Sequence, residues 1–339
     1  MRYQAPWFVL AALCLPPSPA IAQHSGDSVR EVFYPTVAMS NSFTQPMVVV
    51  DRGFLIAIRN RNYLIVHDRD GKSIHDIELK LPGTETVSIS DVAMKRDGTA
   101  VLALIHTPAE RGYGGAIAIL DPAGKIRRFI QTGLYMPLQI CLDEEDRIWT
   151  AGWQRDADRI LEEDKADYPL IRKYGLDGTL ILGAVKRTSV DKGFVSGGHG
   201  RWKMRAAHGL IGILSFRIDD KPEVWTELNL KGEIVGQWTL GPVPLGRKID
   251  GAEFDDHYSR FKYSLGFTVN GELYALCWSC STDDKHFRLA RLDRKSGDWK
   301  IMRETPRDNG ILIGSDGNEL VLARGFGGVQ LTWIKPTMN

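Results

Sequence analysis

The chain has 339 residues, a formal net charge of +1 and a hydrophobic content of 43%. It can bury a large core, and length alone favours two domains. The near-neutral charge excludes the basic excess that is typical of nucleic-acid-binding proteins and of proteins that dock on anionic membranes. We therefore expect no nucleic-acid partner.

The first 22 residues have the pattern of a secretory signal peptide. Arg2 precedes a nine-residue apolar run, Trp7 to Leu15, and Ala20-Ile21-Ala22 forms a small-residue cleavage site. Such a run is too short to cross about 30 Å of hydrocarbon, and no later segment is long and apolar enough to do so. We therefore expect residues 1–22 to be removed, no membrane span, and residues 23–339 to be exported to a periplasm or secreted.

Residues 87–132 form the unit that the chain repeats. Four strand-like segments follow one another, and two short turns end in glycine, at Gly98 and Gly124. The first two segments are almost continuously apolar, and the last alternates as an outer strand does. The segments are Val87–Met94, Thr99–His106, Ala116–Leu120 and Ile126–Gln131. One four-stranded antiparallel sheet is the predicted structure of this unit.

The two turns recur along the chain with a period near 54 residues. No segment has a helical period of any length, so the repeat indicates a β-propeller rather than a two-domain α/β protein. The first turn recurs at Arg52-Gly53, Asp97-Gly98, Glu145-Asp146, His208-Gly209, Asn270-Gly271 and Asp316-Gly317. The second recurs at Asp70-Gly71, Ala123-Gly124, Asp177-Gly178, Lys231-Gly232 and Ser296-Gly297.

The sixth repeat has a first turn but no second turn, because the chain ends soon after one last strand at Val329–Ile334. Its sheet therefore lacks an outermost strand, which residues 29–34 are free to supply. Such pairing would remove an exposed sheet edge. We expect one all-β domain over residues 23–339, a six-bladed β-propeller with four antiparallel strands per blade, closed by an N-terminal strand that completes the last blade.

The register sorts the connections onto two faces. The short glycine turns all lie on one face, and the long connections lie on the other, where functional loops usually sit. We therefore expect the site on the long-loop face, at the mouth of the central channel. The long connections are Pro108–Gly114, Trp153–Tyr168, Val185–Trp202, Gly241–Phe261 and Ser279–Phe287.

Two of these loops carry the candidate ligand-binding residues, His199, Arg201, Asp250 and His257. His199 and Arg201 lie in a glycine-rich loop, and such a pair can bind an anion or move a proton. Asp250 and His257 lie in an acidic loop, and carboxylates beside a histidine can ligate a metal or act as acid and base. Solvated loops and ordinary surface ion pairs are the alternative interpretations.

Three cysteines remain in the mature chain. Cys277 and Cys280 form a C-x-x-C motif without the helix that a redox pair caps, and both a structural disulfide and two free thiols fit an exported protein. Zinc binding is a third alternative. In an extended strand the two residues stand about 10 Å apart, so a disulfide requires the strand to end near Trp278. Cys141 lies in an apolar inner strand and is expected to be buried and inert.

The repeats resemble the NHL-type and TolB-like six-bladed propellers, a superfamily that includes gluconolactonases, streptogramin lyases and many noncatalytic members. The resemblance rests on residues 137–149 and 309–320, each an inner strand, a tight turn and a second strand. In the lactonases a divalent cation such as calcium sits in the channel. The resemblance implies Asp250, Asn309 and Glu85 as its ligands here, although Asp250 precedes Asn309 and a second asparagine has no match.

These observations lead to two functional hypotheses. The first is an exported, noncatalytic and monomeric propeller, without cofactor, that binds a small molecule or a protein partner through its long-loop face. The second is a metal-dependent lactonase-like hydrolase or lyase with its site at the channel mouth. There a bound cation would polarise a carbonyl or activate water.

Overall fold

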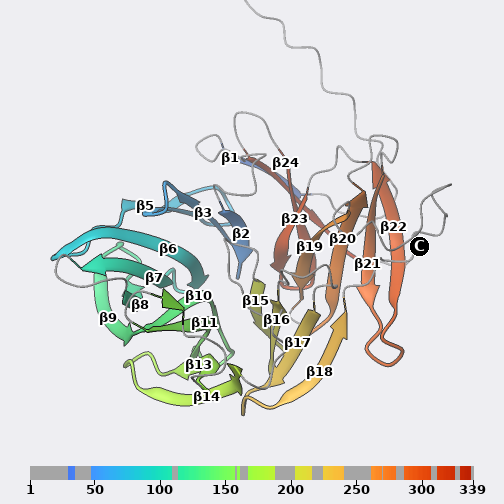
Figure 1. The fold of residues 1–339 in the computed structure, drawn as a ribbon. Coiled ribbons are helices and arrows are strands. Elements are labelled where there is room, and N and C mark those ends of the chain that lie inside the picture. Colours follow the sequence, from blue (N-terminus) through green and yellow to red (C-terminus); the bar gives the residue numbers. More distant parts are fainter. Residues whose placement is uncertain are drawn as a thin grey trace, which may run out of the picture.

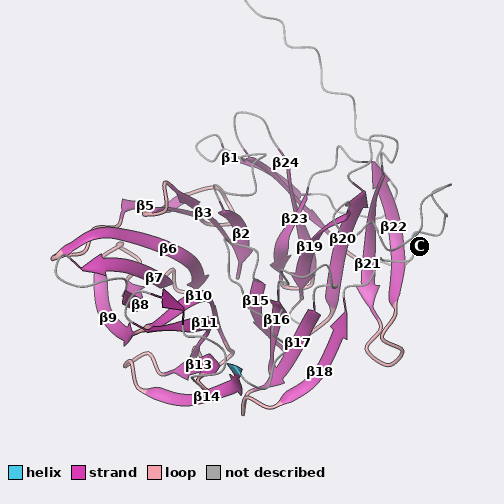
Figure 2. Cartoon of the chain, in the orientation of Figure 1, coloured by secondary structure: helices cyan, strands magenta, loops and turns pink. Residues whose placement is uncertain are grey.

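The computed structural model describes residues 30–34, 47–108, 114–156, 159–160, 167–187, 203–215, 224–239, 261–268, 270–279, 286–306, 311–324 and 329–336. These residues form strands and loops without an α-helix (Figure 2). No helix among them is long and apolar enough to cross a membrane. The predicted signal peptide, residues 1–22, lies outside this part of the chain.

Four sheets are each built from strands that follow one another in the chain and pair antiparallel. The first contains β6 (Thr84–Met94), β7 (Ala100–Pro108), β8 (Gly114–Leu120) and β9 (Ile126–Gly133). The second contains β10 (Tyr135–Leu142), β11 (Ile148–Asp156), β13 (Pro169–Tyr174) and β14 (Leu180–Lys186), with the short β12 (Arg159–Ile160) beside β11. The third contains β15 (Lys203–Ala207), β16 (Leu210–Ser215), β17 (Val224–Asn229) and β18 (Ile234–Thr239), and the fourth contains β19 (Phe261–Phe267), β20 (Leu273–Ser279), β21 (His286–Leu292) and β22 (Trp299–Pro306).

The remaining eight strands form one sheet in the order β1-β25-β24-β23-β2-β3-β4-β5. Its two halves meet at a single parallel pair, Val50 with Gly314, between β2 and β23. In one half β1 pairs antiparallel with β25, from Arg30 opposite Trp333 to Tyr34 opposite Val329. The strands are β1 (Arg30–Tyr34), β2 (Met47–Asp51), β3 (Phe54–Arg59), β4 (Tyr63–His67), β5 (Ser73–Glu78), β23 (Ile311–Asp316), β24 (Glu319–Arg324) and β25 (Val329–Ile334).

The sheets are arranged around a common centre (Figure 1). Contacts between sheets run mainly through their first strands, with β10 against β6, β7 and β15, and β19 against β23. Within the eight-stranded sheet, β23 and β2 lie side by side in the same way. The later strands of each sheet lie progressively farther out. This radial arrangement of four-stranded antiparallel sheets is a β-propeller.

The predicted turns are confirmed by the backbone. The last residue of every predicted turn has a positive φ, whether it is a glycine or, in one case, Asp146. Between β2 and β3 both turn residues are left-handed, with φ of 48° at Arg52 and 87° at Gly53. That is the geometry of a two-residue hairpin whose twist matches the flanking strands. The last strand, Val329–Ile334, has its predicted bounds, and the four strands predicted within residues 87–132 are present as β6 to β9. Their bounds differ by one to three residues, since β6 begins at Thr84 and β7 ends at Pro108.

The hydrophobic core is divided into clusters that lie between neighbouring sheets. Ile56 and Leu64 from β3 and β4 pack in one cluster with Leu102 of β7, and all three side chains are fully buried. The same arrangement recurs between the other sheets, and the two halves of the eight-stranded sheet pack likewise, with Leu55 of β3 and Trp333 of β25 in one cluster. Each sheet is therefore buried on both faces, which explains its apolar inner strands.

Candidate functional site

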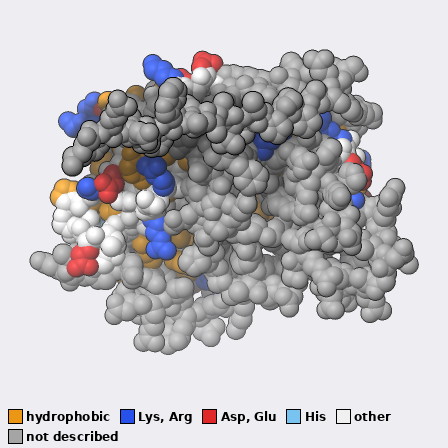
Figure 3. Space-filling view, turned by 90° about the horizontal axis from the view of Figure 1, so that it is seen from above, with side chains coloured by type: hydrophobic (Ala, Val, Ile, Leu, Met, Phe, Trp, Pro, Cys, Tyr) orange, Lys and Arg blue, Asp and Glu red, His pale blue; other side chains and the backbone are white. Residues whose placement is uncertain are grey.

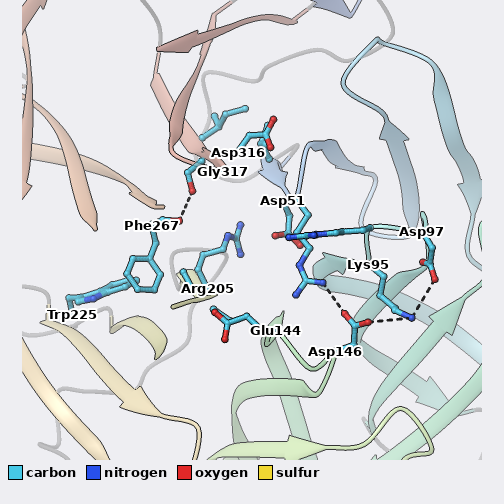
Figure 4. Close-up of a pocket in the computed structure, with 18 residues that line it drawn as sticks. Asp51, Lys95, Asp97, Glu144, Asp146, Arg205, Trp225, Phe267, Asp316 and Gly317 are labelled. Atoms are coloured by element: carbon cyan, nitrogen blue, oxygen red, sulfur yellow. Dashed lines mark hydrogen bonds and ion pairs between the residues drawn. The ribbon is translucent and has the colours of Figure 1, made fainter. Parts of the chain in front are cut away.

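A cavity of about 630 Å³ lies at the centre of the sheets (Figure 4). Its walls come from the last residues of β2, β15, β19 and β23, from the turns that follow β2, β6, β10 and β23, and from Trp225 of β17. The volume falls within the range of about 300–1,000 Å³ that small-molecule sites occupy. Innermost strands of separate sheets thus converge on one space.

The cavity lies at the short-turn end of the channel. Arg52, Lys95 and Asp146 all belong to the tight turns that join the first and second strands of their sheets. The antiparallel topology puts these turns on the face opposite the long connections. The site predicted from the sequence lies on the long-loop face. Most residues of those loops lie outside the described part of the chain, so that site stays a prediction.

Charged turn residues of three sheets are joined at the mouth of this cavity. Arg52 Nη1 donates to Asp146 Oδ1 over 2.9 Å, and Arg52 Nη2 donates to the carbonyl oxygens of Leu142 and Asp143. Lys95 Nζ lies 3.5 Å from Asp146 Oδ2. Arg52 therefore ties the turn after β2 to the turn after β10, and Lys95 adds the turn after β6. The charges of Arg52 and Asp146 offset each other.

Deeper in the channel, two aspartates each bind the backbone of the neighbouring sheet. Asp51 Oδ2 accepts from the N–H of Met94 over 2.8 Å, and Asp91 Oδ2 accepts from the N–H of Ile140 over 2.9 Å. A β-bulge between Ile89 and Asp91 interrupts the pairing of β6, and bulges re-aim the side chains that follow them. The N–H groups of Met94 and Ile140 lie on inner strands and have no partner within their own sheets, so each carboxylate supplies the missing acceptor.

Neighbouring charges shift the pKa of a buried carboxyl in the channel. Asp91 is 2% exposed, and burial raises the pKa of its carboxyl to about 6, with the Arg205 charge lowering it and the Asp51 charge raising it. Burial also raises the pKa of the Cys141 thiol well above its usual value. Cys141 is buried, as expected, and a thiol that stays protonated is a poor nucleophile.

Arg205 of β15 projects into the cavity, between Phe267 on one side and Asp51 on the other (Figure 4). Its Nη1 donates to the carbonyl of Met204 over 2.7 Å. Within the described residues it forms no ion pair at 4.0 Å or less, unlike Arg52 and Lys95. A guanidinium has five N–H donors, so most of its hydrogen-bonding capacity is free for a ligand.

Aromatic and aliphatic side chains form the opposite wall. Phe267 and Trp225 are 6% and 1% exposed, and their rings meet edge to face with centroids 5.4 Å apart. The Trp225 indole N–H is satisfied by Glu227 Oε1 at 2.9 Å, which leaves the ring as an apolar surface. Ala207 packs in the same hydrophobic cluster as the two rings, and Ala206 and Ile313 also line the cavity.

The residues that the sequence singled out are not joined to this cavity by the described structure. His199, Arg201, Asp250, His257, Asn309 and Cys280 lie outside the described residues. Glu85 is exposed near the start of β6, and Cys277 stands in β20 between Tyr263 of β19 and Arg288 of β21 in register. No group of three or more His, Cys, Asp or Glu in the described ranges could hold a metal ion. The proposed cation ligands and the cysteine pairing therefore stay predictions.

Arg205, Asp51 and Asp91 were not predicted from the sequence. Asp91 carried a usable signal, because it interrupts the otherwise apolar inner end of a strand, and such a residue needs a partner when buried. Asp51 and Arg205 are flanked by ordinary strand residues, and nothing in their local sequence marks them.

Comparisons with known proteins assign no family to the chain. No family model matches the sequence, and no curated protein matches it. Among solved structures, the model is similar to BamB from Moraxella catarrhalis, with 13% identity over 85% of this chain and 71% of that chain and a TM-score of 0.35. It is also similar to the Dos1 propeller, with 9% identity over 87% of this chain and 80% of that chain and a TM-score of 0.43. At these scores neither structure carries an argument about function, and the chain is described by its own geometry, that of a β-propeller with a charged central cavity.

Proposed function

We propose that this protein is a noncatalytic β-propeller that acts by binding a small molecule in the cavity at the short-turn end of its channel. The observation that carries the proposal is the Arg205 side chain, which enters a cavity of about 630 Å³ without an ion-pair partner among the described residues. The other charged groups around it hold turns together, as Arg52 does with Asp146, rather than converging on one reacting position.

We also propose that the propeller has six blades and that β1 completes the last one. Two observations support this count. The strand β1 pairs with β25 over five residue pairs, which gives the β23–β25 half of the eight-stranded sheet a fourth strand. Hydrophobic clusters also lie between successive sheets, and one of them joins Trp333 of β25 to Leu55 of β3. The first and last sheets would then pack as the others do.

Export to a periplasm or secretion remains part of the proposal, on the strength of the signal-peptide pattern in residues 1–22. The long-loop face, with His199, Arg201, Asp250 and His257, stays the predicted surface for a further ligand or a protein partner. A lactonase-like cation held by Asp250, Asn309 and Glu85 is the alternative hypothesis. Elemental analysis of the exported protein tests it directly.

Native mass spectrometry of the mature protein, exported by its own host, tests the binding function. We expect a small molecule to co-purify and to be lost on denaturation. Arg205→Trp, which fills the cavity from the position whose side chain already projects into it, should reduce the bound fraction at an unchanged unfolding midpoint. If Arg205→Trp lowers that midpoint, wild-type protein refolded from urea replaces it, and extract from the host should raise its Tm. A protein that carries no small molecule, and whose Tm the extract leaves unchanged, would refute the proposal.

A further inference from the structure

We infer that the cavity takes a small monoanion with an apolar body, such as an aromatic or branched carboxylate, and that its anionic group contacts Arg205. This inference rests on the proposed binding function and names the class of ligand. Three features of the cavity carry it: the free donors of Arg205, the mutual pairing of the other charges, and the apolar wall beside the guanidinium.

The first feature is the position of Arg205. It lies in β15, half-buried, and Figure 4 shows its guanidinium extending into the space between the two walls. Its one described hydrogen bond goes to the carbonyl of Met204, the residue before it. A planar guanidinium with free donors matches the two oxygens of a carboxylate, and such bidentate pairs are stronger than neutral hydrogen bonds.

The second feature is that most of the other charged groups of the wall are paired with each other or with backbone groups. Asp146 is bonded to Arg52, and Lys95 lies between Asp146 and Asp97. Glu144 accepts from the N–H of Gly209 with both oxygens, at 3.0 and 3.1 Å. These paired groups do not neutralise Arg205. Arg96, in the turn after β6, also lines the cavity without an ion pair in the described ranges, but it is exposed, whereas Arg205 is half-buried. The guanidinium of Arg205 is therefore the better shielded partner for an anionic group inside the cavity.

Two carboxylates set the limit on ligand charge. The charges of Arg205 and Asp51 both act on the Asp91 carboxyl, and each of the two carboxylates is hydrogen-bonded to a backbone N–H. Two negative groups this close to the guanidinium repel a second negative charge on the ligand. A monoanion is therefore favoured over a dianion.

The third feature is the wall formed by Phe267 and Trp225. These side chains are buried, and their rings pack edge to face, which fixes their positions. In Figure 4 the two rings lie on the side of Arg205 away from Asp51 and Asp146. A ligand whose anionic group is held by Arg205 can place its body against this wall, where burial of its apolar surface favours binding.

Isothermal titration calorimetry with benzoate and phenylacetate, against the neutral benzamide and phenylacetamide, tests the inference at pH 7 and low salt. We expect the acids to bind at least about ten-fold more tightly than the amides, in line with the greater strength of charge-assisted pairs. Arg205→Met should remove that preference, and Arg205→Lys should retain part of it. Arg147→Met is the matched control, because this half-exposed arginine in the turn after β10 does not line the cavity. Phe267→Leu should weaken the binding of acids and amides to the same extent.

The outcomes separate this inference from the proposed function. Amides that bind as well as the acids, or acid binding that survives Arg205→Met, would overturn the anion assignment while the cavity remained a binding site. A neutral or cationic molecule found on the native protein would do the same. If neither acids nor amides bind, and the native protein carries no small molecule, the inference and the proposed function fail together. If Arg205→Met does not fold, Arg205→Gln makes the same comparison.

Discussion

The indole Nε1 of Trp149 donates a hydrogen bond to Oδ2 of Asp143 over 2.9 Å, and both residues are almost fully buried. Lys173 Nζ lies 3.3 Å from the same oxygen and 4.9 Å from the centre of the Trp149 ring. A carboxylate shared by an indole N–H and a cation recurs at two other places. Glu227 accepts from the indole N–H of Trp225 and forms an ion pair with Arg294. Asp316 accepts from the indole N–H of Trp333 and forms an ion pair with Arg69. Asp143 joins strands of one sheet in this way, whereas Glu227 binds an arginine of the next sheet.

We predict that Asp143→Ala lowers the free energy of unfolding by about 3–5 kcal/mol, because it leaves the buried Lys173 ammonium without its carboxylate. It also removes the acceptor for two turn N–H groups, those of Glu145 and Arg147. Urea denaturation measures the change. The control is Lys80→Ala, which breaks the exposed pair with Glu78 and should cost less than about 1 kcal/mol. Equal effects for the two variants would contradict the structural role given to Asp143.

Gly152 of β11 lies where no side chain fits. A Cβ there would come within 2.1 Å of the carbonyl oxygen of Met136 in β10, next to the bulge that follows Pro137. The obstacle is backbone, so it cannot move aside as a flexible side chain would. We predict that Gly152→Ala destabilises the protein by about 3 kcal/mol, the upper part of the range for overpacked sites.

The control for Gly152 is Gly83→Asn. Gly83 has a φ of 71° with open space around it, and asparagine tolerates that left-handed region. The variant should unfold at nearly the wild-type urea concentration. Similar losses at both positions would show that backbone freedom, and not the approach of β10 to β11, explains Gly152.

The pairing of β1 with β25 can be tested by a cross-link. Glu31 and Thr332 are opposite each other in register. We predict that the double variant Glu31→Cys and Thr332→Cys forms a disulfide on oxidation, seen as a shift in non-reducing electrophoresis after proteolysis. The pair Glu31→Cys with Gln330→Cys is two residues out of register and should link less well. Equal linkage in both would argue against the register, and absence of linkage in both against the pairing.

The architecture could be predicted from the sequence because the residues that determine its turns and strands act locally. The tight turns need residues that adopt positive φ, and glycine supplies them at intervals near 54 residues, as at Gly71, Gly124 and Gly178. Strand type follows from apolar runs between the turns. Asp146 was found at a turn position without glycine only because the repeat pointed to it.

The cavity could not be predicted from the sequence in the same way, because its lining depends on which turns meet in the folded chain. Arg52 and Asp146 are 94 residues apart, and only the arrangement of the sheets brings their turns together. The length and composition of the long loops predicted a site there, whereas Arg205, with its free guanidinium, lies in a five-residue strand of ordinary composition. Whether a charge is paired depends on tertiary contacts that a local pattern does not encode.

Asp91 should make stability depend on pH in mildly acidic solution. Its pKa in the folded state is about 6 against a usual value of 3.8, so between about pH 4 and 6 the folded state holds a proton that the unfolded state has lost. Stability from this group is therefore greatest below pH 4 and falls as the pH rises to about 6, by about 3 kcal/mol for a shift of about two pH units.

Asp91→Asn isolates this effect, because the asparagine oxygen can still accept from the N–H of Ile140. We expect the stability of the wild type relative to Asp91→Asn, measured by urea denaturation from pH 4.0 to 7.5, to fall by about 3 kcal/mol across the range. In Arg205→Met the pKa of Asp91 should rise further, since the Arg205 charge lowers it, and the fall should extend to higher pH. Parallel pH profiles for wild type and Asp91→Asn would show that Asp91 is ionised in the folded protein throughout, and would contradict the raised pKa of its carboxyl.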